Sequence, residues 1–171
     1  PGRRRIATLL AFLLLLMLGV AQSSIGHIWS VFGVTPNAVL VAVVCSGLLG
    51  GARTGTIWGV LGGLVLGLLS GAPFGAHMLV LGIIGYVAGP TQHSPFQSLF
   101  VIPTLTIAGA TTVYLAGMAA ILRLSGWPIT LDARLLYMLA WAILLNAALM
   151  VVCYWVAAHV IETRSRTRAS F

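Results

Sequence analysis

The sequence has very little charge, and negative charge is almost missing. Only 6% of its 171 residues are charged: nine are arginine, none is lysine, and there is one aspartate and one glutamate. Soluble domains carry about 25% charged residues, which form a hydrated surface. With 60% hydrophobic residues, this chain cannot build such a surface. The composition excludes a soluble enzyme, a disordered tail and a disulfide-stapled secreted domain, and it predicts an integral membrane protein.

Groups for catalysis and metal binding are also scarce. The two acids, Asp132 and Glu162, fall at the edges of apolar segments, so no predicted span carries the carboxylate that proton-coupled transport usually needs. The two cysteines and four histidines lack paired ligand spacing, and no nucleophile-elbow, zinc-protease or phosphate-loop motif occurs. The sequence therefore predicts no enzyme activity, no metal and no cofactor.

What the sequence does contain is a series of apolar stretches separated by turn residues. A membrane helix takes roughly 20 residues to cross ~30 Å of hydrocarbon, so the length allows at most about seven crossings. Clusters of Gly, Pro, Ser and Asn divide the chain into six helices. The prediction is one all-α integral membrane domain over residues 1–171, a six-transmembrane-helix bundle. Its helices cover approximately residues 5–21, 36–49, 55–69, 75–88, 95–122 and 133–161.

Helix starts are predicted from capping residues. Thr35 is predicted as the N-cap of the second helix, with Pro36 at its first position. Ser94 and Gln97 have capping-box spacing before the fifth helix, and Asp132 is predicted to cap the sixth. Residues 50–53 are predicted to form the turn that ends the second helix.

The arginines predict the orientation. Six crossings place both termini and the turn at Arg53 on one side of the membrane, which then carries seven arginines against two, Arg123 and Arg134, on the other. This distribution predicts cytoplasmic termini and does not require nucleic-acid binding, although the C-terminal arginines can also contact anionic lipid. Merging residues 55–69 with 75–88 would give five crossings and place the C-terminal arginines outside, against the positive-inside rule. In the six-crossing arrangement, the seven arginines on the side of the termini are Arg3, Arg4, Arg5, Arg53, Arg164, Arg166 and Arg168.

Glycine spacing is the strongest pattern in the chain. Gly55, Gly59, Gly63, Gly67 and Gly71 recur every four residues and form one face without side chains on the third helix. Small residues let helix backbones approach closely in lipid, where packing replaces the hydrophobic effect as the driving force. The face is predicted to pack inside this chain, and the alternative is an interface for the helix of another protein.

Asn146 lies near the middle of the last helix. A bare amide in hydrocarbon is costly, so the side chain must face a polar partner. Hydrogen bonding inside the bundle is the favoured interpretation, and contact with a ligand or partner protein is the alternative. Tyr114, Tyr137 and Trp141 are further groups that could join Asn146 in lining a small-molecule pocket.

Two motifs resemble a known family. The turn Leu68-Leu69-Ser70-Gly71-Ala72-Pro73-Phe74-Gly75 follows a glycine-rich helix, and the next helix ends in Gly85-Tyr86-Val87-Ala88-Gly89. This stretch resembles the most recognisable part of the MreD family of rod shape-determining membrane proteins. The Pro36-Asn37 helix start and the last helix, centred on Asn146, fit as well. One position departs from the family pattern: Gly67 stands where the family often has an aspartate.

The resemblance implies a six-span bacterial inner-membrane protein of the cell-elongation machinery, without known catalytic activity. It implies binding to MreC, and work with MreB, RodA and a class B penicillin-binding transpeptidase in lateral peptidoglycan synthesis. The family fold resembles the substrate-binding subunits of energy-coupling-factor vitamin transporters, so such a subunit is the alternative function. A vitamin site needs convergent polar groups beside aromatics, and no clear set of polar loop residues is present.

Overall fold

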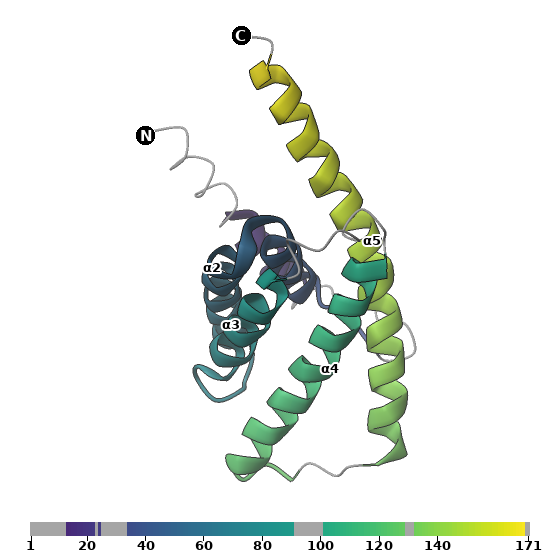
Figure 1. Cartoon of the computed structure of the whole chain (residues 1–171). Coiled ribbons are helices and arrows are strands. Elements are labelled where there is room, and N and C mark those ends of the chain that lie inside the picture. Colours follow the sequence, from purple (N-terminus) through teal and green to yellow (C-terminus); the bar gives the residue numbers. More distant parts are fainter. Residues whose placement is uncertain (1–12, 23, 25–33, 91–100, 129–131, 170–171) are drawn as a thin grey trace.

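The computed structural model describes residues 13–22, 24, 34–90, 101–128 and 132–169, and its regular elements there are helices (Figure 1). Three of them, α2, α4 and α5 as far as Val156, are long and apolar enough to cross a membrane, which agrees with an all-α membrane protein. Two shorter helices are also apolar. The elements are the segment Leu13–Gln22, α2 (Ala38–Leu69), α3 (Ala76–Ala88), α4 (Val101–Leu124) and α5 (Ala133–Ala169).

The helix α2 is broken at Gly51, inside the predicted turn. Gly51 has φ 80° and ψ 175°, a backbone conformation that glycine tolerates because it lacks a Cβ. A Cβ placed on Gly62 would lie 2.8 Å from Val39 Cγ1. In one straight helix these residues would be about 35 Å apart, at 1.5 Å rise per residue. The two parts, a first arm (residues 38–50) and a second arm (residues 52–69), therefore fold back on each other as an antiparallel hairpin.

The predicted cap of the first arm is wrong by two residues. The helix begins at Ala38, and its N-cap is Asn37, whose side-chain oxygen accepts a hydrogen bond from the Leu40 backbone N–H at 2.9 Å. Thr35 and Pro36 stay outside the helix. The physical reason is that asparagine is the stronger N-cap and its amide satisfies an orphan N–H of the first turn.

The helix α3 packs antiparallel against the second arm. The connecting turn ends at Gly75, whose φ of 87° again suits glycine. A Cβ on Gly55 would meet the backbone of Gly85, and a Cβ on Gly63 would lie 2.5 Å from the His77 carbonyl oxygen. Backbone therefore lies against backbone along most of this pair, and α2 with α3 is the most extensive helix contact in the structure (Figure 1).

The segment Leu13–Gln22 lies along the second arm and runs parallel to it. A Cβ on Gly19 would lie 2.5 Å from Val65 Cγ1, and a Cβ on Gly62 would lie 3.5 Å from Leu15 Cδ2. Buried aliphatic side chains from this segment, both arms and α3 form most of the core. They include Leu15, Val39, Leu40, Val43, Val44, Leu48, Val65, Leu66, Val80, Leu81 and Ile84.

The helices α4 and α5 form a second hairpin, which extends beyond α2 and α3 toward its connecting turn (Figure 1). Asp132 directly precedes α5, and its carbonyl oxygen accepts from the Leu135 N–H at 2.9 Å. The last helix continues to Ala169, so its predicted end near residue 161 was too early. The predicted start of the fifth helix, with Ser94 and Gln97, falls outside the described residues.

Candidate functional site

Asn146 is the centre of a buried polar group that joins three helices. Its side chain is 2% exposed. Its Oδ1 accepts from the Asn37 backbone N–H at 2.7 Å, and its Nδ2 donates to Thr111 Oγ1 at 3.1 Å. Thr111 in turn donates to the Ile107 carbonyl at 2.7 Å, an intrahelical bond available to threonine. Asn146 thus ties α5 to the start of α2 and to the middle of α4.

A second set of hydrogen bonds runs from the Tyr114 hydroxyl, which lies near the Asn37 side chain, toward α3. That hydroxyl lies 3.1 Å from His77 Nδ1, and His77 Nε2 lies 2.9 Å from Ser70 Oγ. The His77 and Tyr114 rings are stacked, with centroids 6.0 Å apart. The polar chain, as we call these six residues, comprises Ser70, His77, Tyr114, Asn37, Asn146 and Thr111.

Each side chain of the polar chain has a partner. Among the described residues, no buried side-chain nitrogen or oxygen lacks a hydrogen bond. In hydrocarbon each unpaired polar group is costly, so a fully paired chain fixes the helices in one arrangement. The described part of the chain also contains no group of three His, Cys, Asp or Glu residues placed to hold a metal ion. The arrangement is suited to holding the helices together at these hydrogen-bonded side chains.

The glycine face divides into two parts. Gly55, Gly59 and Gly63 are buried against the α3 backbone, and a Cβ on Gly59 would meet Leu81 and lie 3.0 Å from the Gly82 Cα. A Cβ on Gly67 or Gly71 would meet nothing within 4 Å. The face therefore packs inside this chain over three of its five glycines, and its last two glycines lie beyond that contact.

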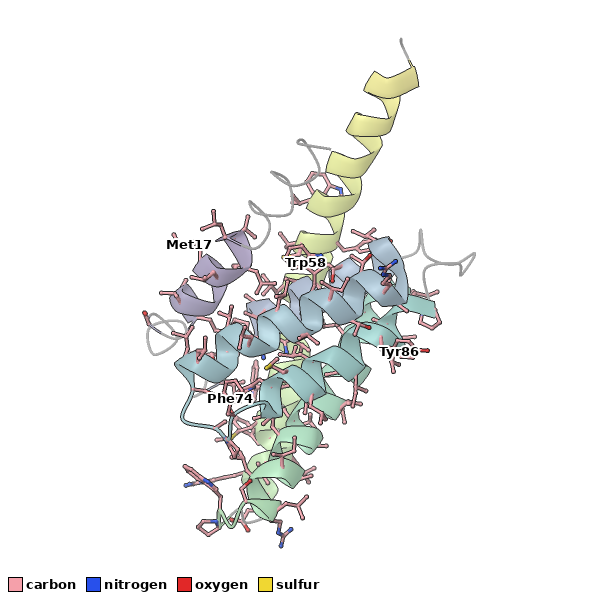
Figure 2. The ribbon with its side chains drawn as sticks, turned by 90° about the vertical axis from the view of Figure 1, so that its left-hand side faces the viewer. Met17, Trp58, Phe74 and Tyr86 are labelled. Carbon is pink, nitrogen blue, oxygen red and sulfur yellow. The ribbon has the colours of Figure 1, made fainter. Side chains whose placement is uncertain are left out.

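The remaining predicted aromatic groups lie elsewhere. Tyr137 and Trp141 form an edge-to-face pair on α5, with ring centroids 6.3 Å apart. Large apolar side chains elsewhere point outward: Phe74 on the α2–α3 turn is 78% exposed and Tyr86 on α3 is 61% exposed (Figure 2). In a membrane protein such side chains are expected to face lipid.

Sequence reasoning identified Asn146 and Tyr114 but missed three of their partners. Asn37 enters the sequence analysis only as part of a helix start, and His77 only as one of four histidines without ligand spacing, whereas the His77 side chain is 7% exposed. Thr111 is not singled out by the sequence. The available signal was that each is a polar residue inside or at the end of an apolar helix, where it needs a partner.

Comparison with known proteins returned one match. A family model described as MreD, rod shape-determining protein MreD, matches residues 3–160 of the chain. No curated protein and no solved structure matches it.

Proposed function

This chain belongs to the MreD family of rod shape-determining membrane proteins, and on that basis we propose that it is a non-catalytic scaffold of the bacterial cell-elongation machinery. It binds MreC in the inner membrane and supports lateral peptidoglycan synthesis together with MreB, RodA and a class B penicillin-binding transpeptidase. The observation that carries this proposal is the family match over residues 3–160.

The proposed topology is a single domain of six crossings with both termini in the cytoplasm. The break at Gly51 supports it, because the two arms of α2 then cross in opposite directions. The parallel packing of Leu13–Gln22 with the second arm agrees with this alternation. Seven arginines on the cytoplasmic side against two outside agree with the positive-inside rule. The short helices, such as the 13 residues of α3, suit a locally thinned bilayer.

The architecture of the site supports a scaffolding role. The polar chain and the glycine face both hold helices in fixed positions, one by hydrogen bonds and the other by close backbone contact. A rigid bundle of this kind presents its outer helix surfaces to partner helices in a constant geometry.

Affinity purification from native membranes in a mild detergent, followed by mass spectrometry, tests the proposal. We expect MreC in the eluate of the tagged full chain and none in the eluate of an unrelated six-span protein expressed at the same level. Recovery of an ATPase module or a tightly bound vitamin in place of MreC would contradict the proposal and favour a transporter subunit.

A further inference from the structure

The polar chain shows at which level the two regions of the bundle meet. Asn37, the N-cap of α2, hydrogen-bonds Asn146, which is near the middle of the apolar stretch Ala133–Val156 of α5. His77, in the first turn of α3, lies 3.1 Å from the hydroxyl of Tyr114, which is near the middle of α4. The first residues of α2 and α3 therefore lie level with the middle of the α4–α5 hairpin, and the hairpin extends beyond them (Figure 1).

The part of the hairpin that extends beyond this level is apolar. From Tyr114 to Arg123 the helix α4 advances about 14 Å, and from Asn146 back to Arg134 the helix α5 covers about 18 Å. No charged residue lies between the two ends of either stretch. Leu136, in the second stretch, is 71% exposed, so its side chain requires hydrocarbon around it. The two arginines mark the edge of the hydrocarbon on this side of the protein.

The α2–α3 unit presents irregular backbone at the level where the hairpin is still apolar. Residues 70–75, which join α2 to α3, are not helical, and Ser70 and Phe74 are exposed. Thr35, two residues before Asn37, is also exposed and not helical. Irregular backbone does not occur exposed to lipid tails, because its N–H and C=O groups would lack partners. Water or lipid headgroups must therefore reach this end of the α2–α3 unit.

We propose that the outer surface of the hydrocarbon is stepped around this protein, where outer means the side opposite the termini. It extends to Arg123 and Arg134 beside the α4–α5 hairpin, and it is drawn inward beside the α2–α3 turn, where phospholipid headgroups contact the turn. A flat surface at the arginines would bury the turn in hydrocarbon, and a flat surface at the turn would expose Leu136 to water. The partner at this surface is the outer leaflet itself.

Helix lengths agree with the step. The 13 residues of α3 are about 20 Å long, which is less than the ~30 Å of hydrocarbon in an undistorted bilayer. The 24 residues of α4 are about 36 Å long and can cross it fully. A bilayer adapts to such unequal lengths by local thinning. The step rests on the six-span topology proposed above, and it does not depend on the identity of a partner protein.

Spin labels on single cysteines test the step. Thr35→Cys reports on the α2–α3 side, and Leu144→Cys is the matched probe on the hairpin. Leu144 is 59% exposed and lies two residues from Asn146, which places it on the opposite face of α5 at nearly the same level. Trp127→Cys, on the exposed α4–α5 turn, is the reference for a label outside the hydrocarbon.

The three variants are made in the full chain carrying Cys45→Ala and Cys153→Ala and are reconstituted into vesicles of phosphatidylethanolamine and phosphatidylglycerol. Power-saturation electron paramagnetic resonance measures the collision rate of each label with a water-soluble nickel chelate and with oxygen, which concentrates in hydrocarbon. We expect the nickel-to-oxygen ratio of the label at residue 35 to be close to that at residue 127 and several-fold higher than that at residue 144.

Phe74→Cys is a second probe of the α2–α3 turn if the Thr35 variant does not fold (Figure 2). A low ratio on the α2–α3 side would overturn the step, because the turn would then lie in hydrocarbon. A high ratio for Leu144→Cys would overturn it as well, because the outer half of the hairpin would then stand in water. A reporter fused to the C-terminus separates these failures from a wrong topology, since a C-terminus outside the cytoplasm would contradict the six spans and the assignment to the outer leaflet.

Discussion

The α2–α3 unit and the α4–α5 hairpin are held in different ways. In an apolar stretch of 18 residues in α2, 50% of the residues are buried inside the protein, against 22% in such a stretch of α4 and 17% in one of α5. Glycines bring the α2 and α3 backbones into contact, with little room for any side chain. The α4–α5 hairpin joins this unit through buried side chains such as Ile107 and Met150 and through hydrogen bonds at Asn146 and Tyr114.

This difference indicates which kind of substitution each region tolerates least. Close backbone contact tolerates no added volume, because the opposing atoms cannot rotate out of the way. A hydrogen-bonded joint tolerates changes in volume better, but it fails when one partner is removed or changes its protonation state. Steric and polar substitutions should therefore affect the two regions unequally.

The largest effect is expected from Gly59→Leu in the α2–α3 unit. The new side chain would meet the Leu81 backbone, and overpacking against backbone should cost ~3 kcal/mol or more in stability. We expect loss of the protein from the membrane, measured by immunoblot of membrane fractions. Gly67→Leu is the matched control, since its Cβ would meet nothing within 4 Å and the protein should accumulate normally. Equal levels of the two variants would break the distinction between the two parts of the glycine face.

A smaller effect is expected from Asn146→Leu at the joint between the two regions. The substitution leaves the buried Asn37 N–H without an acceptor and should cost about 1–2 kcal/mol, within the range for an orphaned buried donor and for hydrogen bonds in membrane bundles. Thermal unfolding in detergent micelles measures the loss. Combined with Thr111→Val, the loss should be less than the sum of the two single losses, because both remove the same bond. Strict additivity would contradict the geometry of the joint.

The smallest effect is expected from Thr111→Val, which keeps the shape but removes a hydroxyl. Thr111 accepts from Asn146, so we expect a loss of about 0.5–1.5 kcal/mol. Thr112→Val on the neighbouring residue is the control: Thr112 also donates to a carbonyl of its own helix, at 3.0 Å, but it is exposed and its change should be nearly neutral. A larger loss from Thr112→Val would mean that the intrahelical bond, rather than the contact with Asn146, matters.

Features that depend on local sequence were predictable. The turn at Gly51 follows from a glycine pair, and the approach of Gly55 to Gly85 follows from glycines spaced by four residues on both helices. The number of glycines covered by α3 was not predictable from the sequence. The helix α3 begins only at Ala76, and the turn before it leaves Gly67 and Gly71 uncovered.

The polar chain shows why the site was only partly predictable. Asn37 and Asn146 are 109 positions apart in the sequence, and His77 and Tyr114 are 37 apart. The cost of a buried amide predicts that Asn146 has a partner, but the partner depends on how two helix hairpins pack, which spacing within one helix does not encode.

The central structural claim is that α2 is a hairpin, because the reversal at Gly51 determines how many times the chain crosses the membrane. Val39→Cys with Gly62→Cys tests it directly in the full chain carrying Cys45→Ala and Cys153→Ala. The two arms bring these positions into contact, with a Cβ on Gly62 2.8 Å from Val39 Cγ1. We predict rapid intramolecular disulfide formation, seen as a mobility shift that reductant reverses. In a straight α2 the two thiols would be about 35 Å apart, so a folded protein that fails to cross-link would contradict the hairpin and the six-span topology.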